Sequence, residues 1–157
     1  DPLLVLALML EESRYDPDAV SYVGARGLTQ IMPSTGREIA GRISINPFFT
    51  EMLFQPELNI KMGTWYLGSI ARRFKKRVQD NLGNNHSHIT KSDRDYVAMM
   101  LAVGAYNGGE SRVKRWMAKY GIQDIDEFVE NIPIYETRRY IKKVFDSYEM
   151  YKAIYKD

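Results

Sequence analysis

Two adjacent glutamates, Glu11 and Glu12, stand at the end of the opening apolar run of the chain, which covers residues 3–10. A helix that is apolar all round belongs inside a protein, so these carboxyl groups arrive where a buried helix should end. Burial disfavours the charged form of a carboxyl group and raises its pKa. A carboxyl group that keeps its proton near neutral pH can act as a general acid. The pair therefore suggests acid–base chemistry, with two solvated glutamates at a helix end as the plainer alternative.

The composition is that of an ordinary globular protein, with 45% hydrophobic and 27% charged residues among 157. This length fits one domain, and we expect residues 1–157 to form a single domain, mature or cut from a longer chain. The absence of cysteine excludes disulfides and thiol chemistry without deciding the compartment. A net charge of +2 is too small to argue for a nucleic acid or an anionic membrane as partner.

Membrane and export signals are not found in the sequence. No segment reaches the roughly 18 consecutive apolar residues that a spanning helix needs, so we expect no stable membrane insertion. The opening run is short, lacks a basic flank and begins with Asp1-Pro2, which is unlike a signal peptide. Any export signal is therefore expected to lie outside this chain.

Two apolar stretches predict buried helices that would position the chemistry. The first covers residues 3–14, because Asp1 can cap it and Pro17 disfavours helix at the residue before it. The second covers residues 96–107 and ends at the turn signal Gly108-Gly109.

Further helices are predicted from capping and periodicity, and no alternating pattern is long enough to build a sheet. The result is an all-α domain of about seven to nine helices around the two buried ones. Thr35 with Glu38, and Ser92 with Asp95, have the spacing of N-terminal caps. The remaining helices are expected at 35–42, 50–54, from residue 56 to the basic cluster 72–77, and at 111–120, 126–131 and 136–156, the last with an apolar face that includes Tyr148, Tyr151 and Tyr155.

Two features suggest other ligands only weakly. His86 and His88 lie in an apparent surface loop, residues 80–91, without the neighbouring ligands that a metal site needs, so no metal is expected. The basic cluster 72–77 suits the negative end of a helix dipole. Together with residues 112–115 it leaves a nucleic-acid or anionic-polymer contact as an outside alternative.

Four segments, taken in order, resemble the soluble lytic transglycosylase family, the lysozyme-like catalytic domains that cut peptidoglycan. A lone Glu-Ser pair is not specific, but the ordered set covers nearly the whole chain. The segments are Glu12-Ser13 with Pro17, then Ser21 and Gly24-Ala25-x-Gly27-Leu28-x-Gln30-Ile31-Met32-Pro33-x-Thr35; Asn59-Ile60-x-x-Gly63-x-x-Tyr66-Leu67; Ala105-Tyr106-Asn107-Gly108-Gly109 with Arg112-Val113; and Ile132-Pro133-x-x-Glu136-Thr137-Arg138-x-Tyr140-Ile141.

The resemblance implies a lysozyme-like fold with a substrate cleft and a reaction that needs one carboxyl group. Glycosidases ordinarily use two. Here Glu12 would protonate the leaving oxygen and then take the proton of the 6-hydroxyl of the muramic sugar, giving a 1,6-anhydro end without added water. Glu12 is favoured over Glu11 because it matches the Glu-Ser pair, and adjacent helix residues point about 100° apart. Asp16 and Asp18 better suit a loop turn and a cap than a second catalytic role.

The other site residues follow from the resemblance. Tyr140 would hydrogen-bond Glu12 and help set its pKa, and Met32 would form an apolar wall. The remaining expected substrate contacts are Ser21, Gln30, Tyr106, Asn107 and Glu136, each of which could instead serve packing or capping. The family often has another sequence at 108–111, so the shape of this loop and a rim contact by Glu110 stay open. It also often has Met where this chain has Thr29, a position that could tune a sugar subsite.

The resemblance thus favours an enzyme that cleaves the bond between N-acetylmuramic acid and N-acetylglucosamine. The alternatives are a hydrolytic muramidase of goose-lysozyme type and a non-catalytic peptidoglycan-binding module. No cofactor is implied. The expected partners are peptidoglycan strands and neighbouring domains or envelope proteins, not nucleic acid, and the expected location is the periplasm or cell envelope.

Overall fold

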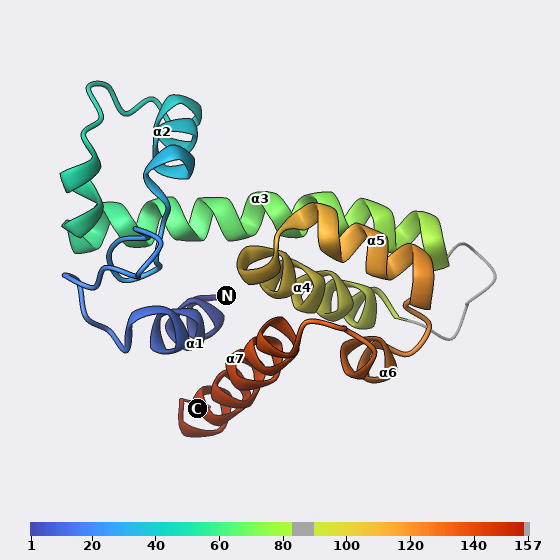
Figure 1. Ribbon diagram of the computed structural model, residues 1–157. Helices are drawn as coiled ribbons and strands as arrows, with labels where there is room; N and C mark the ends of the chain where they lie inside the picture. The colour runs from blue at the N-terminus through green and yellow to red at the C-terminus, as the bar shows by residue number, and fades with distance from the viewer. Residues whose placement is uncertain (83–89, 156–157) are drawn as a thin grey trace. The chain divides into compact units, whose positions relative to one another are not determined.

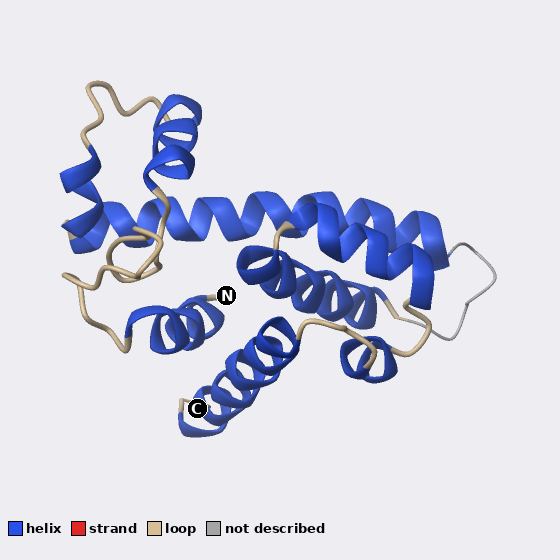
Figure 2. Ribbon diagram, viewed as in Figure 1, coloured by secondary structure: helices blue, strands red, loops and turns tan. Residues whose placement is uncertain are grey.

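The computed structural model describes residues 1–82 and 90–155, and within them helices are joined by loops and turns (Figures 1 and 2). This part of the chain contains seven α-helices, one 3₁₀ helix and two isolated β-bridges around Arg26 in place of strands. The prediction of an all-α protein with about seven to nine helices is confirmed. The elements are α1 (Pro2–Ser13), α2 (Pro33–Arg42), η1 (Thr50–Phe54), α3 (Pro56–Leu82), α4 (Lys91–Gly108), α5 (Glu110–Tyr120), α6 (Ile125–Glu130) and α7 (Tyr135–Ile154).

The chain divides into two compact units. The first consists of residues 1–66 and 146–157, and the second of residues 67–145. The first unit thus holds α1, α2, η1 and the beginning of α3, together with the end of α7. The second holds the rest of α3, then α4, α5 and α6, and the beginning of α7.

In the first unit, α1 begins and ends as its sequence predicts. The Leu3 amide donates to Asp1 Oδ1 at 2.8 Å, which confirms Asp1 as the N-cap. The helix stops at Arg14, whose φ of 54° lies in the left-handed region. The last turns of α7 fasten to this helix, because the Tyr148 hydroxyl donates to Asp1 Oδ2 at 2.7 Å. Tyr155 lies just beyond the end of α7 and is 64% exposed, so its expected place on the apolar face of that helix is wrong.

The helix α2 starts two residues earlier than the capping box of Thr35 and Glu38 predicted. Pro33 occupies its first turn, and Met32 is the N-cap without a side-chain hydrogen bond. Proline fixes a helical φ and lacks only an amide that has no partner there anyway, so it begins the helix ahead of the threonine. The inner face of α2 then packs into a core of buried residues: Ile31, Ile39, Ala40, Leu53 and Met62.

In the second unit, α4 is the buried central helix. Nine of its residues are buried, from Val97 to Gly108. Its cap is Thr90, whose hydroxyl accepts from the Asp93 amide at 3.1 Å, while Asp93 Oδ2 accepts from the Thr90 amide at 2.8 Å. The cap expected from Ser92 and Asp95 is therefore wrong by two residues, because Thr90 and Asp93 have the same spacing two residues earlier.

Helix α5 lies beside α4 (Figure 1) and buries Val113, Trp116 and Met117. It ends at Gly121, whose φ is 74°. Ile141 of α7 packs against Gly104 of α4 so closely that a Cβ there would lie 2.8 Å from Ile141 Cδ1. The second unit is thus a tight packing of helices around α4.

The expected loop at 80–91 falls mostly on residues 83–89, so His86 and His88 lie outside the described residues. Within the described part, no three potential metal ligands of the His, Cys, Asp or Glu type come together. None of the helices traced there is both long enough and apolar enough to cross a lipid bilayer.

Candidate functional site

Glu12 is the penultimate residue of α1, and the residue after it holds this helix end in place. The Ser13 hydroxyl reaches the carbonyl oxygens of Met9 at 3.2 Å and of Leu28 at 2.8 Å. The second of these bonds joins the last turn of α1 to the loop at 26–31. Both Glu11 and Glu12 are half-buried. The serine of the Glu-Ser pair thereby fixes where the neighbouring glutamate emerges.

The loop that receives this bond is a tight turn. Arg26 and Ile31 exchange two backbone hydrogen bonds of 3.0 and 3.1 Å, and the Gln30 amide donates to the Gly27 carbonyl at 3.1 Å. Gln30 has a φ of 50°, in the left-handed region that non-glycine residues seldom adopt. Such a conformation persists only where the surroundings hold it.

The Gln30 side chain helps to stabilise this left-handed backbone conformation. Its amide nitrogen donates to the carbonyl oxygens of Ala19 at 3.1 Å and Gly27 at 2.8 Å. Both amide hydrogens therefore serve the loop, and the group that Gln30 can offer a sugar hydroxyl is its acceptor, Oε1. Met32 follows at the N-cap of α2 and is 37% exposed, as a side chain forming an apolar wall would have to be.

The side chain of Asn59, on the first turns of α3, clamps this loop. Its Nδ2 donates to the carbonyl oxygens of Leu53 at 2.7 Å and Arg26 at 3.0 Å. Its Oδ1 accepts from the Thr29 amide at 2.8 Å and from the Thr29 hydroxyl at 2.6 Å. Asn59 is 0% exposed, and all its hydrogen-bonding groups are used. One buried amide therefore fixes the loop, η1 and α3 to one another.

Two glycines allow this close approach. A Cβ on Gly27, whose φ is 75°, would lie 2.2 Å from the Leu53 carbonyl oxygen, and a Cβ on Gly63 would lie 2.4 Å from Thr29 Oγ1. Side chains at these positions would push the loop off α3. Thr29 itself is 0% exposed and faces Asn59, so the expectation that it tunes a sugar subsite is wrong.

The loop between α1 and this turn has structural roles for three polar residues. Ser21 Oγ accepts from the Ala25 amide at 3.0 Å, which closes a turn and leaves the half-buried hydroxyl its donor. Asp16 Oδ1 accepts from the Asp18 amide at 2.9 Å, and both aspartates are exposed. The loop turn expected of this pair is confirmed.

The other predicted site residues belong to the second unit. Tyr106 and Asn107 end α4, where the Thr137 hydroxyl donates to Asn107 Oδ1 at 2.9 Å. Asn107 is exposed, and this bond leaves its amide hydrogens to donate.

The partner of Asn107, Thr137, follows the exposed Glu136 in the first turn of α7. Tyr140 lies one turn further on and is 9% exposed. The bond between Glu12 and Tyr140 joins residues of different units and stays a prediction.

Glu110, whose rim contact the sequence left open, is engaged in ion pairs within the second unit. Its carboxylate lies 2.8 Å from Arg73 Nη2 and 2.6 Å from Lys114 Nζ. Burial by itself would raise the pKa of Glu110, but the hydrogen bonds from Arg73 and Lys114 outweigh it and lower that pKa below its usual value. The glutamate ties α5 to α3.

This network predicts a pH-dependent contribution to stability. A lowered folded-state pKa stabilises the protein above the unfolded pKa of about 4.3, and the gain is lost as the pH falls through the folded pKa. We expect Glu110→Gln to lower the free energy of unfolding at pH 7 by about 1 kcal/mol, the scale of a partly exposed ion pair. Urea unfolding from pH 7 to pH 3 should show the difference narrowing below about pH 4. A pH-independent difference would mean that packing, not charge, is lost.

The sequence did not assign roles to Ser13 and Asn59, although both stand in the motifs. An asparagine with apolar residues on either side, one turn before a glycine, is a usable signal, because a buried amide must find partners for all its groups. The carbonyl that Ser13 reaches lies fifteen residues further along, and local spacing does not reveal such a bond.

Known proteins match this chain over most of its length. The model of the family described as "Transglycosylase SLT domain" matches residues 1–129. The soluble lytic murein transglycosylase of Escherichia coli K12 is 35% identical over 150 residues, which are 93% of this chain and 20% of that protein. The chain thus spans about a fifth of the length of this relative.

Solved structures agree. The 70-kDa soluble lytic transglycosylase of Escherichia coli matches with a TM-score of 0.79 and 32% identity, over 100% of this chain and 22% of that one. An inactive Glu-to-Gln mutant of the lytic transglycosylase Slt from Pseudomonas aeruginosa matches with a TM-score of 0.76 and 28% identity, over 98% and 22%. The lysozyme-like all-α fold expected from the resemblance is confirmed, and the chain belongs to the transglycosylase SLT domain family.

Proposed function

We propose that this chain cleaves the glycan strands of peptidoglycan as a lytic transglycosylase. The observation that carries the proposal is the family match over residues 1–129, which includes Glu12 and the whole loop that Asn59 clamps. The relatives are named as enzymes acting on murein, and one of them is inactive with a single glutamate changed to glutamine. A reaction that depends on one glutamate is what the motif set predicts for Glu12.

The proposed reaction uses one carboxyl group twice. Protonated Glu12 gives its proton to the glycosidic oxygen as the bond to the anomeric carbon of N-acetylmuramic acid breaks. The carboxylate then takes the proton of the 6-hydroxyl of the same sugar, whose oxygen bonds to the anomeric carbon. The product is a 1,6-anhydro sugar, and no water is consumed. Glu12 ends as it began, protonated and ready for the next strand.

The aspartates near Glu12 support a single-carboxyl mechanism. A hydrolase with two carboxyl groups needs the second one fixed across the bond from the first. Asp16 and Asp18 are exposed, and Asp16 accepts a hydrogen bond within its own loop turn. A carboxylate engaged in a local turn is poorly placed to activate water.

Substrate contacts are proposed for the residues that the motifs identify. Gln30 Oε1 would accept from a sugar or N-acetyl group, since its amide nitrogen is engaged in the loop. Asn107 would donate through its amide, whose oxygen already accepts from Thr137. The other proposed roles are those expected from the resemblance: Ser21 and Glu136 as hydrogen-bonding groups, Met32 as an apolar wall, Tyr106 as a lining residue and Tyr140 as the partner of Glu12.

The proposed substrate also implies a location. Murein lies in the bacterial cell envelope, so the chain would act in the periplasm or at the envelope, brought there by an export signal. Neighbouring domains are proposed as partners, because the relatives are about five times as long as the matched region.

The decisive experiment distinguishes the anhydro route from hydrolysis. Purified peptidoglycan is digested in H₂¹⁸O, and the released fragments are weighed by mass spectrometry. The proposal predicts fragment ends lighter by one water than hydrolytic ends and free of ¹⁸O. A hydrolytic lysozyme, run beside it, gives the labelled ends. Labelled ends from this chain would instead assign it to the muramidases of goose-lysozyme type, and no fragments at all would favour a binding module.

A further inference from the structure

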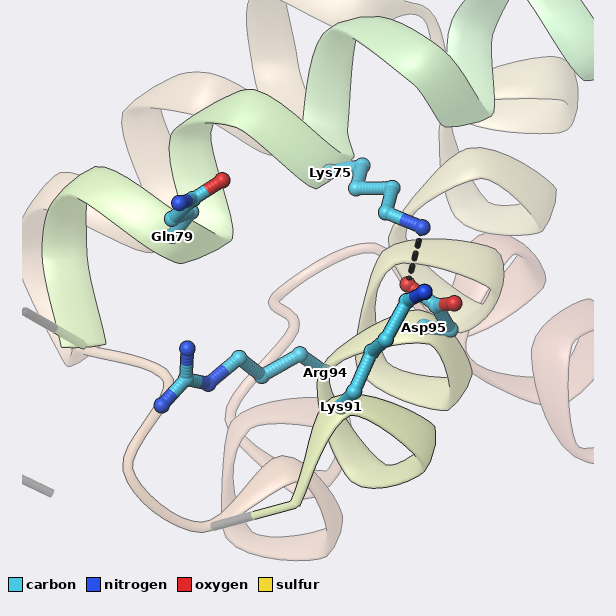
Figure 3. Close-up of a pocket in the computed structure, with 5 residues that line it drawn as sticks. All are labelled: Lys75, Gln79, Lys91, Arg94 and Asp95. Atoms are coloured by element: carbon cyan, nitrogen blue, oxygen red, sulfur yellow. Dashed lines mark ion pairs between the residues drawn. The ribbon is translucent and has the colours of Figure 1, made fainter. Parts of the chain in front are cut away.

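A pocket of about 290 Å³ lies between α3 and α4 in the second unit. The five side chains that line it are Lys75, Gln79, Lys91, Arg94 and Asp95 (Figure 3). Three of them are cations and one is a carboxylate, so the lining carries a positive charge. None of these residues belongs to the segments that carry the family resemblance.

The carboxylate neutralises only one of the cations. Lys75 Nζ lies 2.6 Å from Asp95 Oδ1, and Figure 3 shows the two side chains pointing toward each other. Arg94 extends away from this pair in the same view, so its guanidinium is directed elsewhere in the pocket. Lys91 and Arg94 thus supply the positive charge that the ion pair leaves over.

Arg94 also carries a hydrogen-bond donor without an acceptor. Its Nε is buried, and no partner for it lies among the described residues. A buried donor without an acceptor is destabilising, and one attached to a charged group more so. An acceptor oxygen of a ligand that reached this group would supply the missing partner.

The surrounding charge favours an anion. Residues 67–145, which make up the second unit, contain fifteen Lys and Arg against nine Asp and Glu. The remainder of the chain has seven against eleven, so the positive charge is concentrated in the unit that contains the pocket. A positive surface raises the local concentration of anions and their rate of association.

We propose that this pocket binds an oxyanion through Lys91 and Arg94. Guanidinium and ammonium groups form charge-assisted hydrogen bonds with carboxylates and phosphates, and arginine can do so with two parallel donors. Two sources have this chemistry: a phosphate group, or the carboxylates of the peptide stems attached to peptidoglycan. The second source rests on the proposed function, whereas the first does not.

The test measures binding and not cleavage, so its failure leaves the proposed function untouched. Isotopically labelled protein is titrated at low salt with inorganic phosphate and, separately, with a stem peptide that has free carboxylates, while backbone amide resonances are followed. Saturable shifts are expected in residues 75–79 and 91–95. Binding of phosphate alone identifies a phosphate site, and binding of the peptide, with or without phosphate, identifies a carboxylate source.

Variants of the lining residues show whether the pocket itself binds the anion. Lys91→Gln and Arg94→Gln should each weaken binding about tenfold or more, because hydrogen bonds to charged groups contribute about 1.5–3 kcal/mol. Lys76→Gln removes the same charge from an exposed position of α3 outside the pocket, and it should change the affinity less than twofold. Circular dichroism would confirm that each variant folds.

Asp95→Asn is expected to change the affinity for the anion in the opposite direction. It releases Lys75 from its ion pair and removes a negative charge from the lining, so the affinity for the anion should rise several-fold. The proposal is overturned if neither probe saturates. It is also overturned if the Lys76 control loses as much affinity as the pocket variants, or if Asp95→Asn binds more weakly than the unchanged protein.

Discussion

Replacing Glu12 by glutamine is expected to lower the rate of fragment release from peptidoglycan by a factor of about 10²–10⁴, the range attributed to a positioned general acid and base. The amide is nearly the same size as the carboxyl group, but it does not give up a proton at neutral pH and does not accept one from a hydroxyl. Both steps of the proposed reaction fail together. The measurement is the rate of appearance of anhydro ends, followed by mass spectrometry.

Glu11→Gln is the matched control for this prediction. Glu11 is the same residue type, in the same turn of α1, and is half-buried like its neighbour. The two side chains point about 100° apart around the helix, so only one of them can serve a given site. The Glu11 variant should keep its rate within a few-fold. If the two variants exchange these behaviours, the catalytic assignment moves to Glu11.

Binding separates loss of chemistry from loss of structure. The Glu12→Gln variant should still sediment with insoluble peptidoglycan, because the proposed contacts of Gln30, Met32 and Asn107 are unchanged. It should also unfold at the same urea concentration as the unchanged protein. Unchanged fragment release by a well-folded variant would remove Glu12 from its role and leave the proposed mechanism without its acid.

The parts of the fold that the sequence predicted are those set by strong local signals. The apolar run of α1, the cap at Asp1, and the apolar stretch of α4 ending in two glycines each fix a helix without help from distant residues. The errors occurred where two local signals compete. Helix α2 begins at Pro33 and not at the capping box of Thr35 and Glu38. Helix α4 is capped by Thr90 with Asp93 and not by the pair with the same spacing two residues later.

The sequence predicted which residues form the candidate site better than it predicted their hydrogen-bond partners. The motifs name Gln30, but not that both its amide hydrogens serve the loop, which follows from carbonyl groups three and eleven residues away. They name Thr29, but not that Asn59, thirty residues later, buries it. Pairings of this kind depend on how α3 packs on the loop, and spacing along the chain does not contain that information.

Asn59→Leu is expected to lower the free energy of unfolding by about 3–5 kcal/mol, a large share of the stability of a small protein. Leucine has the same branched shape and number of heavy atoms and is somewhat larger, so it leaves little room for a water molecule to replace the lost groups. The Arg26 carbonyl oxygen keeps its hydrogen bond from the Ile31 amide. The Thr29 amide and the Leu53 carbonyl oxygen, however, stay buried without their partner. Each such group costs about 1–3 kcal/mol. Urea denaturation, followed by circular dichroism, measures the change.

Two further variants give reference values for this loss of stability. Thr29→Val removes only the hydroxyl that donates to Asn59 Oδ1, so its cost should be about 1 kcal/mol. Thr64→Leu places the same leucine on an exposed position of α3, where a change within about 0.5 kcal/mol is expected. A loss at position 59 no greater than at position 64 would mean that the four hydrogen bonds contribute little.

The same clamp connects stability to catalysis. Asn59 fixes Thr29, and the preceding Leu28 carbonyl accepts the Ser13 hydroxyl next to Glu12, so loosening the loop also loosens the end of α1. At a temperature where the Asn59→Leu variant is still folded, its cleavage rate should therefore fall, while Thr64→Leu keeps the full rate. A folded Asn59 variant with an unchanged rate would show that Glu12 is held by α1 alone, with the loop needed only for stability.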